Sequence, residues 1–137
     1  GNWFTFEGVK GQYVWGLPDD LVELVAPELW HLDWQRMSRP GCLDAQFRLF
    51  EDYASHVARF DAIAEYHRTH QPRALVLWGR RDVFFAIDEV LAYHRALDRV
   101  EMHVYDGGHF LLETHCAAAA RDIRRFLAAE RVESGSG

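Results

Sequence analysis

The stretch ALVLWGRRD, residues 74–82, decides how this chain folds. It opens with a continuous apolar run that closes at Gly79, a pattern typical of a strand buried on both faces of a sheet. Two arginines and Asp82 follow the glycine directly. The stretch therefore predicts a buried strand whose carboxyl end opens into a polar turn.

Beyond this run, the sequence alternates helical and strand patterns. Residues 88–97 place apolar side chains on one side of a helix, residues 100–105 alternate as a strand, and residues 113–127 return to helical spacing. This order predicts a parallel βαβα unit, and the fold class is therefore α/β. Since two parallel strands need neighbours on both edges, we expect another segment to complete the sheet.

The first half is rich in aromatic residues separated by glycine and proline, which predicts short elements joined by loops. Pro18 followed by two aspartates predicts a helix start that leads to a stop at Pro27. Asp44 is expected to be the N-cap of a longer amphipathic helix, and a second such helix carries Ile63.

Composition narrows the classes of protein to which the chain can belong. With 137 residues, 49% of them hydrophobic, it can form a globular core. The net charge of −6 and the lack of a polybasic run argue against binding to nucleic acid or to an anionic membrane. No membrane span or signal peptide is recognisable, and Cys42 and Cys116 have no disulfide or zinc-site spacing, so we expect a cytoplasmic protein.

An acid and a histidine follow the two predicted strands. Asp82 ends the turn after the first strand, and His109 stands within YDGGHFLLE, residues 105–113, after the second. Ligands of open α/β sheets bind beyond the carboxyl ends of the strands, so these two side chains should meet there. A carboxylate that binds one imidazole nitrogen fixes the tautomer and leaves the other nitrogen to act as a base. Each residue alone could be a turn former or a helix cap, but the pair favours a catalytic role.

The stretch from Pro72 to Leu127, with ALVLWGRRDVFF and VEMHVYDGGHFLLETH, resembles the C-terminal part of α/β-hydrolase-fold enzymes of the epoxide hydrolase and haloalkane dehalogenase group. In that family the acid of the W-G-x-x-D pattern and the histidine of G-H-F belong to the catalytic triad, and they match Asp82 and His109. FTFEGVKGQY, RPG and LFEDYASHVARF in the first half resemble the family's helical cap.

The resemblance implies a helical cap over residues 1–70, the C-terminal βαβα part of the hydrolase core over residues 71–130, and a flexible tail over residues 131–137. Aromatic side chains of the cap would then line a pocket for a small apolar substrate. The substrate-binding candidates, each with core packing as the alternative, are Tyr13, Trp15, Trp34, Tyr53 and Phe110.

The nucleophile elbow of that family, G-x-[SD]-x-G, does not occur in this sequence. The resemblance then implies that His109 activates a nucleophile or a water held by an N-terminal hydrolase segment, while Asp82 orients His109. The chain alone is predicted to be inactive. No cofactor or metal is expected: His67 and His70, three apart on a helix, are interpreted as a solvated helix end. Asp106 is an alternative acid or a turn residue.

Two functional hypotheses follow. In the first, the chain is part of a hydrolase that acts on an epoxide, a haloalkane or an ester. In the second, it is a non-catalytic module, truncated or domain-swapped, that binds a partner or a second copy of itself through an exposed sheet edge. A segment cut from a longer hydrolase is a third interpretation, and it too predicts an inactive chain.

Overall fold

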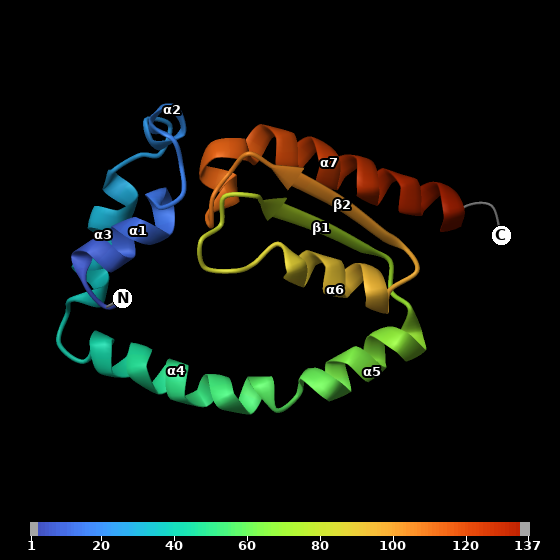
Figure 1. Cartoon of the computed structure of the whole chain (residues 1–137), viewed down its shortest axis with the longest axis horizontal. Helices are drawn as coiled ribbons and strands as arrows, with labels where there is room; N and C mark the ends of the chain where they lie inside the picture. Colours follow the sequence, from blue (N-terminus) through green and yellow to red (C-terminus); the bar gives the residue numbers. More distant parts are fainter. Residues whose placement is uncertain (1–2, 135–137) are drawn as a thin grey trace.

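A computed structural model describes residues 3–134 of the chain. Helices α1 to α5 come first and a βαβα unit follows, as Figure 1 shows. The elements are α1 (Phe6–Val14), α2 (Asp19–Val22), α3 (Glu28–Met37), α4 (Cys42–Val57), α5 (Phe60–His70), β1 (Ala74–Gly79), α6 (Asp88–Ala96), β2 (Val100–Tyr105) and α7 (Leu111–Ser134). Mixed helices and a small parallel sheet are compatible with the expected α/β class.

The two strands pair in parallel, as the sequence predicts. Ala74 lies opposite Val100 at the beginning of the sheet, and Gly79 lies opposite Tyr105 at its end. Helix α6 makes the crossover between the strands, and α7 runs along the other side of the sheet (Figure 1). Both strands therefore end at the same edge, where the loops that carry Asp82 and His109 begin.

The strands are less buried than predicted. The side chains of residues 74–78 are only half-buried, and Val104 on β2 is 51% exposed. The prediction of a strand buried on both faces is therefore wrong for this structure. The physical reason is that the sheet has two strands within the described residues, so each strand keeps one open edge.

The two strands differ in the side chains that they present to α7. On β2, Glu101 accepts a hydrogen bond from Arg125 of α7. The hydroxyl of Tyr105, also on β2, donates a hydrogen bond to Asp122 of α7. Burial, followed by that hydrogen bond, raises the pKa of Tyr105 to about 12. By alternation, β1 presents Leu75 and Leu77 to the same side, so β1 is apolar on both faces and β2 is not.

The first helices form a core of their own. Val9, Val25 and Trp30 are buried together where α1 packs against α3. Helices α4 and α5 contain no buried residue and extend along one side of the molecule (Figure 1). Large apolar side chains are correspondingly exposed along this part of the chain, namely Phe47, Leu49, Phe50, Tyr53, Val57, Phe60 and Tyr66.

The predicted helix boundaries are partly wrong. Helix α2 starts after Pro18, as predicted, but ends at Val22, well before Pro27. Helix α4 begins at Cys42 with Gly41 as its N-cap, so the prediction of Asp44 as N-cap is incorrect. Asp44 instead lies in the first turn, where its carboxylate faces the positive end of the helix dipole.

Helix α7 is longer than the predicted residues 113–127. It runs from Leu111 to Ser134 and has non-helical backbone angles at His115, with φ of −125° and ψ of 20°. It therefore extends into the predicted tail, whose last residues, 135–137, lie outside the described part of the chain.

Gly79 brings the two strand-end loops together. A Cβ atom at this position would lie 2.3 Å from the carbonyl oxygen of Gly108 and 2.5 Å from that of Gly107. These are backbone atoms, which cannot rotate away as a side chain can. A side chain at residue 79 would therefore force the loop of Asp82 away from the loop of His109.

We expect Gly79→Ala to lower the free energy of unfolding by about 1–3 kcal/mol, because the added methyl group overpacks a site bounded by backbone. It should also shift the amide NMR resonances of residues 80–82 and 107–109. Chemical denaturation and a heteronuclear NMR spectrum check both results. Gly41→Ala is the control: its Cβ meets nothing within 4 Å but its φ of +80° disfavours alanine, so it should also lower the free energy of unfolding and yet leave those resonances in place. Unchanged loop resonances in Gly79→Ala would contradict the prediction.

Candidate active site

Backbone hydrogen bonds join the two loops at the carboxyl ends of the strands. The N–H of Arg80 donates to the carbonyl of Tyr105 at 2.9 Å, and the N–H of Arg81 donates to that of Gly107 at 3.0 Å. The parallel ladder thus continues beyond the strands. This continuation places Asp82 and His109 at neighbouring positions.

Asp82 and His109 form a hydrogen-bonded pair. Oδ2 of Asp82 lies 3.0 Å from Nδ1 of His109, and the two side chains are only 8% and 20% exposed. The other carboxylate oxygen, Oδ1, accepts the N–H groups of Phe84 at 2.8 Å and Phe85 at 3.2 Å. Because the loop backbone holds Oδ1, Oδ2 is oriented toward the imidazole.

The arrangement can support general base chemistry. With its proton on Nδ1, His109 donates to Asp82, and its Nε2 has no hydrogen bond to any residue in the described range. A base needs such an available nitrogen, and a carboxylate behind the ring stabilises the imidazolium that forms. The pair can therefore accept a proton from a nucleophile or a water placed at Nε2.

Three phenylalanine rings surround His109. The ring centroids of Phe84, Phe110 and Phe85 lie 4.7, 5.1 and 5.5 Å from that of the imidazole. Phe85 is 46% exposed, so this side of the site is open. The sequence places all three beside the acid or the histidine, and the structure makes them the walls around the pair.

Three of the five predicted substrate-binding residues lie near the pair. Phe110 contacts His109 directly, and Tyr13 meets Phe110 edge to face at 4.6 Å. Trp15 stacks on Phe84 with an angle of 8° between the rings. The Tyr13 hydroxyl, however, donates a hydrogen bond to Asp33. Burial, followed by this hydrogen bond, raises the pKa of Tyr13 well above its usual range.

Trp34 and Tyr53 lie elsewhere. Trp34 packs against the buried core of the first helices, with its ring 6.4 Å from that of Phe6. Tyr53 is 53% exposed on α4 and contacts His56. The structure therefore does not bring these two aromatic side chains to the Asp82 and His109 pair.

An ion-pair cluster links the same two loops at the surface. The carboxylate of Asp106 accepts hydrogen bonds from the guanidinium groups of Arg81 and Arg80. These hydrogen bonds, with that of Arg81 the stronger, hold the pKa of Asp106 well below its usual range. The side chain of Asp106 is thus engaged in tying the loops together, and Asp82 is the acid that meets His109.

The sequence prediction missed two contributions to the site. The first is the pair of amide donors from Phe84 and Phe85 that orients Asp82, although an aspartate that opens a turn is a known signal for such bonds. The second is the joint contact of Arg80 and Arg81 with Asp106. The positions of both arginines next to the strand end, and of Asp106 next to the other strand end, could have indicated it.

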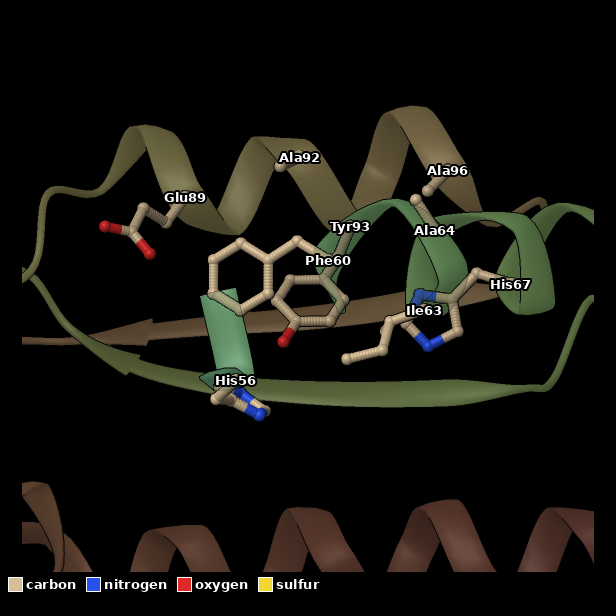
Figure 2. Close-up of a pocket in the computed structure, with 9 residues that line it drawn as sticks. All are labelled: His56, Phe60, Ile63, Ala64, His67, Glu89, Ala92, Tyr93 and Ala96. Atoms are coloured by element: carbon tan, nitrogen blue, oxygen red, sulfur yellow. The ribbon is translucent and has the colours of Figure 1, made fainter. Parts of the chain in front are cut away.

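An open pocket lies between α5 and α6, away from the strand-end loops. It has a volume of about 360 Å³, and Figure 2 shows Glu89 and His67 at opposite ends of it. It is lined by His56, Phe60, Ile63, Ala64, His67, Glu89, Ala92, Tyr93 and Ala96.

Across residues 3–134, no group of three or more His, Cys, Asp or Glu side chains is placed to hold a metal ion.

The chain is similar to an uncharacterized hydrolase from Saccharomyces cerevisiae. The two are 37% identical over 112 residues, which cover 82% of this chain and 38% of the yeast protein. This chain thus matches well under half the length of that relative. No family model and no solved structure matches the chain. The similarity supports a hydrolytic function in general and does not indicate a substrate.

In the described part of the chain, no helix is both long and apolar enough to span a membrane.

We expect Asp106→Asn to lower the melting temperature at neutral pH and to lower it less in strong acid. The folded-state pKa of Asp106 lies below its unfolded value of about 3.9, so its contribution is present above that value and is lost as the pH falls through the folded-state pKa. Thermal unfolding followed by circular dichroism at pH 7 and near pH 2 tests this. Because the three side chains are partly exposed, 1 M salt should reduce the difference at pH 7.

The control for this series is Glu51→Gln, at an exposed position on α4 outside the cluster. Its melting temperature should follow that of the unchanged chain at both pH values. A deficit in Asp106→Asn that is as large in strong acid as at neutral pH would show that the charge of Asp106 is not what stabilises the loops.

Proposed function

We propose that this chain is the C-terminal part of an α/β-fold hydrolase and supplies the acid and the histidine of its catalytic triad. The hydrogen bond from Nδ1 of His109 to Asp82, at the carboxyl ends of adjacent parallel strands, is the observation that carries the proposal. The similarity to the yeast hydrolase supports it in general terms. The finer assignment, to the epoxide hydrolase and haloalkane dehalogenase group, rests on the motifs around Asp82 and His109.

In the proposed reaction, Nε2 of His109 accepts the proton of an attacking serine, or of the water that hydrolyses an ester formed on an aspartate. The imidazolium that results is stabilised by Asp82 and returns the proton to the leaving group. The nucleophile belongs to a segment outside this chain. The phenylalanine rings around His109 favour a small, largely apolar substrate, whereas the nucleophile segment decides between ester, epoxide and halide.

The partner segment is proposed to join the sheet at the free edge of β1. A strand that is apolar on both faces is typical of the interior of a sheet, and β1 has this composition. Strand β2 carries Glu101 and His103 toward α7, and inward-pointing charged residues are typical of edge strands. The N-terminal hydrolase segment would thus cover β1 and bring its nucleophile toward His109.

Activity measurements test the catalytic roles. The purified chain is expected to hydrolyse none of a nitrophenyl ester, a styrene-type epoxide or a bromoalkane, because it lacks a nucleophile. In a longer form or a complex that is active, His109→Ala and Asp82→Asn should each lower kcat by about 10²- to 10⁴-fold, the range for loss of a general base or of its orienting carboxylate. His94→Ala, a histidine exposed on α6, is the control and should retain activity.

Native mass spectrometry of the purified material identifies the partner. A co-purifying polypeptide with a G-x-[SD]-x-G elbow would support the proposal. Hydrolysis by the isolated chain that depends on His109 would show that the nucleophile lies in this chain. An active complex in which His109→Ala retains full kcat would overturn the proposed role of the pair.

The alternative function is a non-catalytic module that associates through its sheet edge. The observation that favours it is the half-buried state of both strands, together with the exposed apolar residues of α4. Open edges and apolar surface of this kind commonly bind another strand or a second copy of the chain. A stable homodimer that lacks hydrolytic activity, even in the longest natural form, would favour this alternative.

A further inference from the structure

We infer that Trp15 is a positioning residue for His109 and acts through a stack of packed groups. The stack consists of Gly11, Trp15, Phe84 and His109, and it runs from the backbone of α1 to the imidazole. Trp15 was predicted as a substrate-binding residue. In the structure its indole connects the first helices with the ring of the proposed base through Phe84.

Helix α1 holds the end of the stack that begins at Gly11. Gly11 is buried, and a Cβ atom there would lie 2.3 Å from Cε2 and 2.4 Å from Cδ2 of Trp15. The indole therefore contacts the helix at Gly11, in space that only a glycine leaves open. The N–H of Trp15 also donates to the carbonyl of Gly11 at 2.9 Å, which fixes the backbone of the tryptophan at the end of the helix.

At the other end of the stack, Phe84 connects Trp15 with His109. The rings of Trp15 and Phe84 are nearly parallel, with centroids 5.9 Å apart, and Phe84 lies 4.7 Å from His109. The ring of Trp3 also contacts that of Phe84, with centroids 4.9 Å apart. Aromatic pairs at such distances attract beyond the area that they bury, so each ring restrains the next.

The turn after Trp15 contacts both strand-end loops. Gly16 has φ of +83°, and a Cβ there would lie 2.3 Å from the carbonyl oxygen of Arg81. A Cβ on Gly108 would lie 3.1 Å from Leu17, the next residue of the turn. The segment from Trp15 to Leu17 therefore sits against the loop of the acid and the loop of the histidine at once.

The stack supplies a restraint that the hydrogen bond to Asp82 lacks. One hydrogen bond at Nδ1 restrains that nitrogen but fixes the tilt of the imidazole plane, and with it the direction of Nε2, only loosely. The contact with the tilted ring of Phe84 opposes a change of this tilt, and Trp15 holds Phe84 in place. A base must keep its free nitrogen within hydrogen-bond reach of the nucleophile, so this restraint matters if His109 has the proposed role.

The rate at which the Nδ1 proton of His109 exchanges with water, measured by NMR on the full chain, tests the inference. In Trp15→Ala we expect exchange about two- to tenfold faster, the range implied by loss of one aromatic contact. Trp15→Phe, which keeps a ring on Phe84, should restore most of the protection. Amide exchange within α1 is measured in the same samples, because general loosening would accelerate it as well, whereas loss of the stack alone would not.

Gly11→Ala is the second variant, in case Trp15→Ala does not fold. Alanine favours the helix, but its methyl group displaces the indole, so the exchange at His109 should accelerate while Trp15 is still present. The matched control is Tyr66→Ala, which removes a ring that lies 4.4 Å from a different histidine, His70. It should leave the exchange at His109 unchanged.

Exchange at His109 that is unaltered in folded Trp15→Ala, or in Gly11→Ala, would overturn the inference. Acceleration that is matched by every amide of α1 would overturn it too, because it would assign Trp15 a general structural role. These readouts need no substrate. The exchange measurement can therefore contradict the positioning role of Trp15 while His109 remains the base. Conversely, the activity measurement can contradict the role of His109 while Trp15 still restrains its ring.

Discussion

The contact of backbone with backbone at Gly79 is the constraint on which the candidate site depends. Parallel pairing brings the two strands to a common edge, but it does not by itself make their loops touch. The absence of a side chain at residue 79 lets the carbonyls of Gly107 and Gly108 approach it, and two backbone hydrogen bonds then extend the ladder past the strands. The separation of Asp82 and His109 follows from this approach more than from the charges of the two side chains.

The chain holds this pair by several weak restraints acting in different directions. The amide groups of Phe84 and Phe85 orient the carboxylate, and the arginines on Asp106 tie the loops at the surface. Exposed ion pairs contribute little individually, so the backbone bonds and the ring contacts carry more of the geometry. These restraints are compatible with the proposed role of the pair as a base, since none of the contacts involves Nε2 of His109.

The sequence was sufficient for the features that depend on local pattern. The apolar run at residues 74–79 and the alternation at residues 100–105 are strands, and the residues at their ends meet as predicted. The pattern could not separate Tyr13 and Trp15, which lie near the pair, from Trp34 and Tyr53, which do not. All four stand in similar stretches of aromatic residues, glycine and proline, and their positions depend on long-range contacts: those of Tyr13, Trp15 and Trp34 on how α1 packs against α3, and that of Tyr53 on where α4 extends.

The predicted start of α4 was wrong for a local reason. Asp44 is a favourable N-cap residue, but Gly41 adopts a left-handed conformation, with φ of 80°, that turns the chain into the helix three residues earlier. Burial of the strands depends on what lies across their edges. The apolar composition of β1 therefore suits a strand with a neighbour on each edge. Its half-buried state results from the two-stranded sheet of the described residues.

The division of the buried residues into two groups has a consequence for the dynamics of the molecule. Val9, Val25 and Trp30 are buried among the first helices, whereas Val90, Leu97, Leu111 and Ala119 are buried in the second half of the chain. Helices α4 and α5 between them bury nothing. Segments of this kind open locally at low free energy, so α4 and α5 can unfold locally while the contacts of residues 15–17 with the strand-end loops still hold the two buried groups together.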